Sequence, residues 1–265
     1  MGSLLKFFSL TYAVTWACFI TAVAISPGAA PTEPMLAVRL LVFLGTFAPS
    51  LVALGLTARH DGSAGTKALL RRLFQRPVGA RWYLLAVSYM AAIKLSVALA
   101  LRMGTGSWPR FGHEGVGVIV AAIIISTPFQ SGEEIGWRGY ALPRLAEHIG
   151  FARGSVLLGV IWACWHLPLF FLPGADTYGQ SFPVWALQVT ALSVALAWMY
   201  ARTNGSLLLT MLMHSAVNQT LGIVPSAVPS AENAFSLHAS LVAWLTAAFL
   251  WITAAYFLVR MPKAD

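Results

Sequence analysis

Long apolar runs separated by short polar segments dominate the chain. Many of the runs reach about 20 residues, the length that a helix needs to cross a bilayer core of ~30 Å. The pattern predicts eight spans, at residues 4–26, 35–57, 82–103, 116–143, 153–171, 182–201, 205–223 and 237–259. The expected fold class is therefore all-α, a polytopic transmembrane helix bundle of about eight spans.

Residues 66–76 follow a different pattern. Their apolar and basic side chains fall on opposite helical faces: Leu69, Leu70, Leu73 and Phe74 on one, and Lys67, Arg71, Arg72 and Arg76 on the other. An amphipathic segment of this kind is typical of a helix that lies in the membrane interface. The pattern predicts a short interfacial helix, with a solvated basic loop as the alternative.

The composition is that of an integral membrane protein. Hydrophobic residues make up 58% of the chain and charged residues 10%, whereas soluble domains have roughly 45–50% and about 25%. No internal repeat or long linker divides the sequence, so residues 1–265 are expected to form one domain. The two cysteines, Cys18 and Cys164, lie in apolar runs and offer neither a disulfide framework nor a zinc-finger spacing.

The basic residues predict the orientation of the bundle. The net charge of +8 could suggest nucleic acid, but the cations lie in alternate loops and form no stripe, so no nucleic-acid partner is expected. With the N-terminus inside, twelve fall in cytoplasmic segments: Lys6, Arg59, Lys67, Arg71, Arg72, Arg76, Arg81, Arg144, Arg153, Arg202, Arg260 and Lys263. Three fall outside: Arg39, Arg102 and Arg110. Because cations concentrate in cytoplasmic loops, both termini are expected in the cytoplasm. The host membrane would be the plasma (inner) membrane in a bacterium and the endoplasmic reticulum in a eukaryote.

Two adjacent acids, Glu133 and Glu134, are the acidic residues embedded in the apolar pattern. A charge inside a bilayer is expensive and therefore indicates function. Glu134 and Arg138 are four residues apart, so they can pair across one helical turn. Glu133 is rotated by roughly 100° from its neighbour and is left without that partner. It is the better candidate for a general base that takes a proton from an attacking water.

Three spans bring polar groups to one depth. Glu133, His166 and His214 lie 11, 13 and 12 residues from the cations that mark the inner surface: Arg144, Arg153 and Arg202. At about 1.5 Å per residue, all three lie roughly 16–20 Å from that surface. His166 could hold the attacking water. His214 and Asn218 are four residues apart, so both donors could stabilise the oxyanion of a tetrahedral intermediate.

Three motifs occur in order on separate predicted helices: Glu-Glu-x-x-x-Arg at 133–138, an aromatic residue four before a histidine at Trp162–His166, and His-x-x-x-Asn at His214–Asn218. Together they resemble the CAAX protease and bacteriocin-processing family of intramembrane endopeptidases, which includes the Ras-converting enzyme. The resemblance covers residues 116–220. The departure is Trp162, where the most quoted pattern has Phe, and it bears on local packing.

The resemblance implies an endopeptidase that cleaves near the C-terminus of a membrane-borne or lipid-modified peptide. Glu133 and His166 would activate water, and His214 and Asn218 would form the oxyanion hole. Glu134 and Arg138 would form a structural ion pair. The implied mechanism is glutamate-dependent and uses no metal cofactor, although two histidines and a carboxylate could bind zinc. The expected cavity opens to the cytoplasm.

Several assignments stay open at this point. Lys94 reaches the same depth and could bind a substrate carboxylate, or it could pair with Glu134 or face an aqueous cavity. Trp137 and Trp162 could line a substrate groove or pack between helices. The competing functions are a non-catalytic bacteriocin-immunity or scaffold protein and, ranked last, a proton-coupled transporter. The sequence makes no prediction of oligomeric state.

Overall fold

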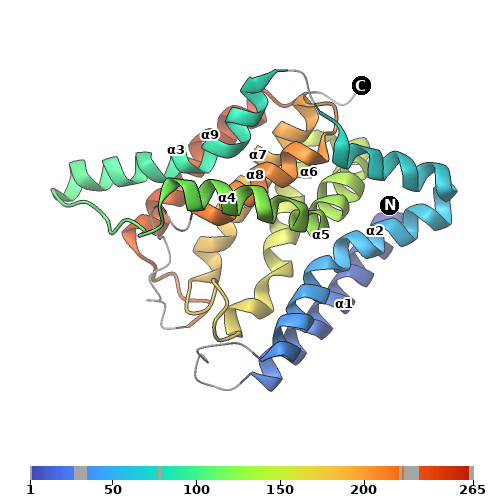
Figure 1. Cartoon of the computed structure of the whole chain (residues 1–265), viewed down its shortest axis with the longest axis horizontal. Coiled ribbons are helices and arrows are strands. Elements are labelled where there is room, and N and C mark those ends of the chain that lie inside the picture. Colours follow the sequence, from blue (N-terminus) through green and yellow to red (C-terminus); the bar gives the residue numbers. More distant parts are fainter. Residues whose placement is uncertain (1, 27–34, 77–78, 221–222, 224–232, 263–265) are drawn as a thin grey trace.

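The computed structural model describes residues 2–26, 35–76, 79–220, 223 and 233–262, and every regular element among them is helical (Figure 1). The α-helices are α1 (Gly2–Ile25), α2 (Leu36–Arg71), α3 (Ala80–Thr105), α4 (Val116–Ser126), α5 (Ser131–Glu134), α6 (Leu142–Trp165), α7 (Phe182–Arg202), α8 (Leu207–Gln219) and α9 (Leu241–Val259). Three 3₁₀ segments and one π-helical segment connect some of them: η1 (Arg72–Phe74), η2 (Thr127–Gln130), η4 (Leu167–Phe171) and the π-helical η3 (Ile135–Ala141).

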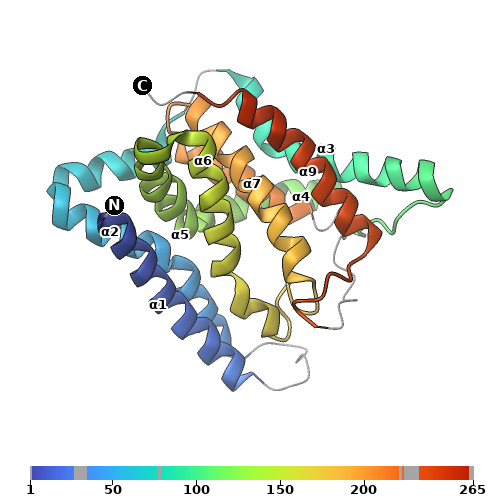
Figure 2. The same cartoon turned by 180° about the vertical axis from the view of Figure 1, so that it is seen from behind.

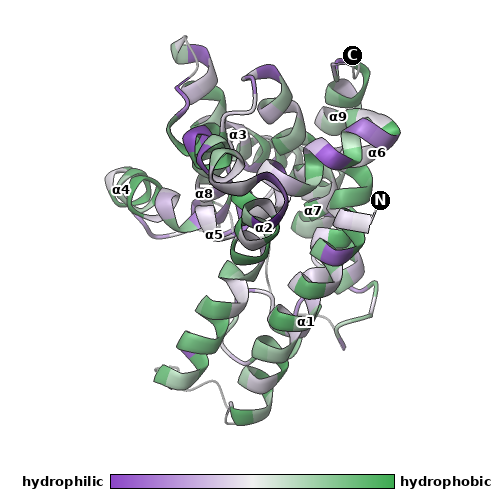
Figure 3. Ribbon diagram, turned by 90° about the vertical axis from the view of Figure 1, so that its right-hand side faces the viewer, coloured by the Kyte–Doolittle hydropathy of each residue, from purple (hydrophilic) through white to green (hydrophobic). Residues whose placement is uncertain are grey.

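The predicted class, an all-α membrane bundle, is confirmed. Within the described part of the chain, six helical stretches are long and apolar enough to cross a membrane. Apolar residues make up most of α1 and of the first part of α2, as the hydropathy colouring of the ribbon shows (Figure 3). The count of eight spans is not confirmed. Helix α8 has 13 residues and is therefore only about 20 Å long, shorter than a bilayer core of ~30 Å.

The predicted span 116–143 is not one regular helix. Helix α4 ends at Ser126, and a 3₁₀ segment with Pro128 in its first turn follows it before α5 begins. Proline lacks an N–H and breaks the helical hydrogen-bond pattern. The helix that then begins at Leu142 continues to Trp165 across a break at Gly150, whose φ of 79° is left-handed. Gly150 thus separates the fourth and fifth predicted spans.

Helix α2 also has an internal break. Gly62 has a φ of 63° and turns the chain back toward the bundle (Figures 1 and 2). The residues after it form the last part of α2 and continue into η1, where the amphipathic helix at 66–76 is predicted. Leu69 is buried and Leu70 and Leu73 are half-buried, but Phe74 is 78% exposed. Only part of the predicted apolar face therefore packs against the bundle, and its place in the membrane interface stays a prediction.

Glycines let the acidic motif approach α2 closely. A Cβ atom on Gly136 would lie 2.6 Å from the backbone of Pro49, and one on Gly132 would lie 2.8 Å from the Phe47 ring. The Ser50 hydroxyl donates to the Ser131 carbonyl across the same contact. Because these glycines have no side chain, the segment that carries both glutamates packs directly against the backbone of α2.

One end of the bundle carries most of the cations, and we call it the basic face. Arg144 lies 3.7 Å from Asp61, Arg202 donates to the Arg260 carbonyl at 2.7 Å, and Arg72 donates to the Tyr200 hydroxyl. These contacts join the ends of α2, α6, α7 and α9. The other end of the bundle, where α1 ends and where α2 and α7 begin, lies on the far side of the molecule (Figure 1).

Candidate active site

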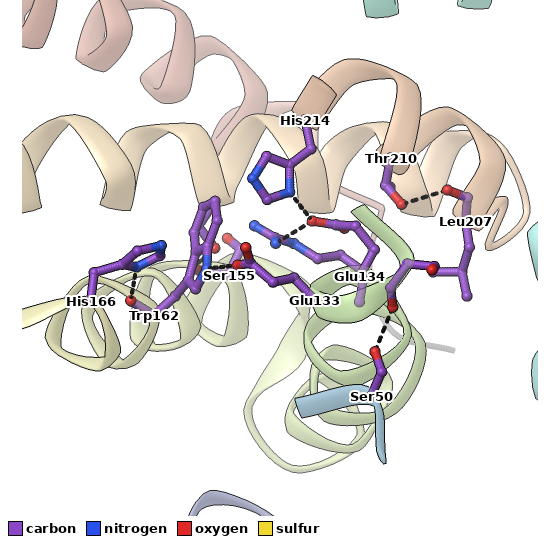
Figure 4. Close-up of polar contacts among 12 residues, drawn as sticks. Ser50, Glu133, Glu134, Ser155, Trp162, His166, Leu207, Thr210 and His214 are labelled. Atoms are coloured by element: carbon purple, nitrogen blue, oxygen red, sulfur yellow. Dashed lines mark hydrogen bonds and ion pairs between the residues drawn. The ribbon is translucent and has the colours of Figure 1, made fainter. Parts of the chain in front are cut away.

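Glu134 is fully buried and has two partners. Arg138 donates to its Oε1 at 2.8 Å, which is the pair predicted from their spacing. His214 Nδ1 lies 2.9 Å from the same oxygen (Figure 4). Arg138 is also fully buried, so carboxylate and guanidinium offset each other's desolvation. The contact with His214 was not predicted, because it joins helices 80 residues apart in the chain.

The π-helical segment η3 helps to bury this pair. All seven of its residues, Ile135 to Ala141, are buried, whereas a regular surface helix presents one face to its surroundings. The segment lies against α2 and α8, so its polar side chains point to protein on every side. Segments of π-helix occur frequently at functional sites. Here the segment holds Arg138 inside the bundle, where it reaches Glu134.

Glu133 has a hydrogen-bond donor of its own. The indole N–H of Trp162 donates to Glu133 Oε2 at 2.7 Å (Figure 4). Glu133 was expected to lack Arg138 as a partner, and its donor is instead an indole from α6. Trp162 also covers Arg138, whose guanidinium carbon lies 4.3 Å from the centre of the ring. Trp162 thus contacts Glu133 directly and also contacts Arg138, the partner of Glu134. This role goes beyond the local packing expected of Trp162.

His166 caps the C-terminal end of α6, next to Trp162. Its Nδ1 lies 2.8 Å from the Trp162 carbonyl oxygen. A carbonyl oxygen can only accept, so Nδ1 carries the proton and Nε2 of the neutral ring is the acceptor. The rings of Trp165 and Trp185 lie 4.5 and 5.0 Å from the imidazole. Aromatic rings therefore hold the ring in place while its Nε2 stays available to a water molecule.

All four predicted catalytic residues line one large cleft of about 1090 Å³. Glu133 enters from α5, His166 from the end of α6, and His214 with Asn218 from α8. Glu133 and His214 are buried, whereas Asn218 is exposed. Hydrogen bonds fix α8 against α4, because Ser215 donates to the Ile123 carbonyl at 2.8 Å and bonds the Ser126 hydroxyl at 2.6 Å. The side chains that residue counting places at one depth on three helices thus line the same cleft.

A second, smaller cavity of about 130 Å³ adjoins the cleft. It is lined by His166, His214, Asn218 and Trp162, and also by Lys94 from α3. Lys94 is only 1% exposed. The predicted depth of Lys94 therefore corresponds to a position beside the histidines. Trp137, in contrast, lines neither cavity. It is fully buried, and its ring lies 5.7 Å from those of Phe7 and Trp165, so it packs between helices.

The cleft lies away from the basic face. Its walls include Arg39 and Phe43 near the start of α2, Glu114 before α4, and the segment 172–177 after η4. Among the described residues, none of the cations assigned to the cytoplasm lines it. The cations that predict the cytoplasmic side therefore give no support to the expectation that the cleft opens there. The common depth counted from Arg144, Arg153 and Arg202 agrees with the shared cleft but does not give the side from which the residues are reached.

Within the described ranges, no three His, Cys, Asp or Glu side chains are arranged to hold a metal ion. His214 Nδ1 bonds Glu134 and His166 Nδ1 bonds a carbonyl, so Nε2 of each ring is the atom that could bind a metal. No step below is assigned to a metal.

Two comparisons with known proteins relate the chain to one family. Residues 113–220 match a family model described as Rce1-like, type II CAAX prenyl endopeptidase. A protein named CAAX prenyl protease 2, from Methanococcus maripaludis, is 26% identical, and the match covers 80% of this chain and 81% of that protein. The resemblance to the CAAX protease family is confirmed.

The family match contains all three motifs of the candidate site, from Glu133 to Asn218. It supports a membrane-embedded protease, and the individual roles of the site residues remain predictions. Two features escaped sequence reasoning. The spacing of Gly132, Gly136 and Gly139 signals a face that packs closely on another helix, and an indole four residues before His166 signals a donor on the same side of α6.

Proposed function

We propose that the protein is an intramembrane endopeptidase that cleaves a peptide bond near the C-terminus of a membrane-borne, lipid-modified peptide. One observation carries the proposal: a carboxylate, two imidazoles and an amide from three separate helices line one cleft. Hydrolysis of an amide needs a base for water and donors for the developing oxyanion. These side chains supply both.

Glu133 is the proposed general base. Trp162 binds its Oε2, which leaves the other oxygen for a water molecule. His166 Nε2 accepts a hydrogen bond from the same water and orients its lone pair toward the substrate carbonyl. As the water oxygen bonds to the carbonyl carbon, Glu133 takes one proton. When the carbon–nitrogen bond breaks, that proton passes to the leaving amine.

His214 and Asn218 are the proposed oxyanion donors. They lie one turn apart on α8 and both line the cleft. Nδ1 of His214 donates to the Glu134 carboxylate, so an oxyanion must be bound by Nε2–H of a doubly protonated ring. Glu134 supports the positive charge of that ring. Glu134 is therefore a positioning residue that acts through His214, in addition to pairing with Arg138.

The cleft walls suit an apolar substrate group. Helix α2 contributes Val42, Phe43 and Phe47, and α4 contributes Val118 and Ile119. The name of the Methanococcus relative describes a prenyl protease. We infer that the lipid of the substrate lies between α2 and α4 and that its peptide extends toward the histidines. The partners are thus the bilayer and a prenylated or similarly lipid-modified peptide.

We further propose that the basic face is cytoplasmic, with both termini, so that the cleft opens toward the opposite side of the membrane. Single cysteines test this in a background without Cys18 and Cys164. Ser63 is exposed beyond the turn at Gly62, and Ser107 is exposed after α3. A membrane-impermeant maleimide should label Ser107→Cys in intact cells and Ser63→Cys only after lysis. The reverse pattern would place the cleft face in the cytoplasm.

Glu133→Gln tests the activity itself. The purified protein is assayed against a library of lipid-modified peptides, beside Glu133→Gln and a matched control, Glu147→Gln, which changes an exposed acid on α6. Activity should fall by at least about a hundredfold in Glu133→Gln, as expected for loss of a general base, and stay at the wild-type level in the control. Metal content and chelator sensitivity are measured on the same preparation. Unchanged hydrolysis by Glu133→Gln would overturn the mechanism. An inactive wild type that still binds its partner would favour the scaffold alternative.

A further inference from the structure

The two cavities meet at the candidate catalytic residues. Of the residues that the structure describes, six line both of them: His166, Asp176, Thr177, Trp185, His214 and Asn218. Glu133 lines the large cleft and Lys94 lines the small cavity, and neither lines both. A peptide bond held between His166 and His214 would therefore have the large cleft on one side and the small cavity on the other. The two sides of the scissile bond would therefore lie in different cavities.

The two sides differ in size and chemistry. The large cleft, about 1090 Å³, has room for a lipid and the preceding peptide. The small cavity, about 130 Å³, has apolar walls from Met90, Val189, Leu192 and Leu196 and a buried cation, Lys94. The carboxylate that lines it, Asp176, is exposed and lines the cleft as well. A small apolar space with a buried ammonium group fits the last residues of a chain and their terminal carboxylate.

The position of Lys94 also argues against a solvated lysine. It is 1% exposed and lies in the middle of α3, which is long and apolar enough to cross the membrane. An ammonium group at that depth is costly and marks a functional site by default. Met90 lies one turn before it and lines the same cavity, so this side of α3 faces the cavity rather than lipid.

We propose that Lys94 binds the free C-terminal carboxylate of the substrate, so that the small cavity holds the residues released by cleavage. The inference rests on the proposed endopeptidase function and adds the reason for cleavage near a C-terminus. The lipid anchors the substrate on one side of the scissile bond, and the carboxylate anchors it on the other. An ammonium–carboxylate hydrogen bond is among the stronger ones in proteins.

The test uses two peptides of the same lipid-modified sequence, one with a free C-terminal acid and one with a C-terminal amide. The wild type should cleave the acid with a kcat/KM about ten- to a hundredfold higher, the range expected for a hydrogen bond to a charged group. Lys94→Met keeps an unbranched side chain without the charge and should cleave both peptides at similar rates. Lys94→Arg should keep part of the preference. Lys67→Met, at an exposed position, is the matched control and should keep all of it.

The outcomes separate the inference from the proposed function. Equal cleavage of acid and amide by the wild type would overturn the role of Lys94 and leave the endopeptidase standing. A Lys94→Met protein that loses rate on both peptides but keeps the preference would also overturn it, because Lys94 would then act only through packing. If the wild type cleaves neither peptide, the proposed function itself fails. The comparison of acid and amide on the wild type decides the matter even if Lys94→Met does not fold.

Discussion

Glu133 and Glu134 are neighbours in the chain, yet they belong to two regions of different character. The interior around Glu134 is closed: its carboxylate is fully buried and contacts Arg138 and His214. The cleft around Glu133 is open to a space of about 1090 Å³, and one indole N–H binds its carboxylate. A rotation of roughly 100° between adjacent helical positions is enough to assign one glutamate to structure and the other to chemistry.

The comparison shows why two adjacent acids can be kept inside a membrane protein. Arg138 offsets the charge of Glu134, and Trp162 lies between the two regions with its ring over Arg138 and its N–H on Glu133. The closed region therefore holds the open one in place. Each prediction below tests one part of this division, beginning with the largest expected effect.

Glu134→Gln should destabilise the protein by about 3–5 kcal/mol, because it leaves the fully buried Arg138 without a compensating charge. Glu133→Gln should change stability far less, since Glu133 has no ion pair with Arg138 and borders a cleft. Thermal unfolding of both variants in the same detergent measures the difference. Equal melting temperatures would show that the two regions are not energetically distinct.

Trp162→Phe should lower kcat about tenfold or more while KM changes little. The ring still covers Arg138, but the donor to Glu133 is gone, and a hydrogen bond to a charged group is worth roughly 1.5–3 kcal/mol. Trp244→Phe makes the same change at an exposed position in α9 and should leave kcat at the wild-type value. A fall in melting temperature without a fall in kcat would mean that Trp162 serves packing alone.

Gly136→Ala should destabilise the protein by about 1–3 kcal/mol, the usual range for overpacking. The new Cβ would lie 2.6 Å from the backbone of Pro49, which cannot turn aside as a flexible side chain can. Gly117→Ala, with nothing within 4 Å of the new Cβ, should be neutral or slightly stabilising. Denaturation curves compare the two. Similar curves would show that the close contact between the acidic motif and α2 is not a requirement of the fold.

Local spacing predicted those features that depend on a single helix. The ion pair of Glu134 and Arg138 follows from four-residue spacing, and the membrane class follows from the length of the apolar runs. Features that depend on contacts between helices were not predictable in this way. The bond from Trp162 to Glu133 and the burial of Trp137 against α1 depend on what lies opposite, whereas the break of span 116–143 follows from Pro128 in the chain itself.

The side on which the cleft opens could not be predicted for the same reason. The positions of cations along the chain indicate which helix ends share a face, but a cleft is the space that packed helices leave between them. Arg39 and Glu114 lie 75 residues apart in the sequence and meet in its wall. Counting residues from Arg144 or Arg202 gives a depth along a helix axis and carries no information about that space.

The smallest effect is expected at the basic face, where an arginine also pairs with a carboxylate but does so near solvent. Arg144 and Asp61 lie 3.7 Å apart, and their side chains are 28% and 49% exposed. Exposed ion pairs contribute about 0–1 kcal/mol, because water and salt screen them, so Asp61→Asn should lower stability by less than about 1 kcal/mol. Unfolding measured at low and high salt should show a further decrease of this small difference, whereas the loss in Glu134→Gln should be nearly independent of salt. A loss at Asp61 as large as that at Glu134 would mean that the basic face, and not the buried pair, holds the bundle together.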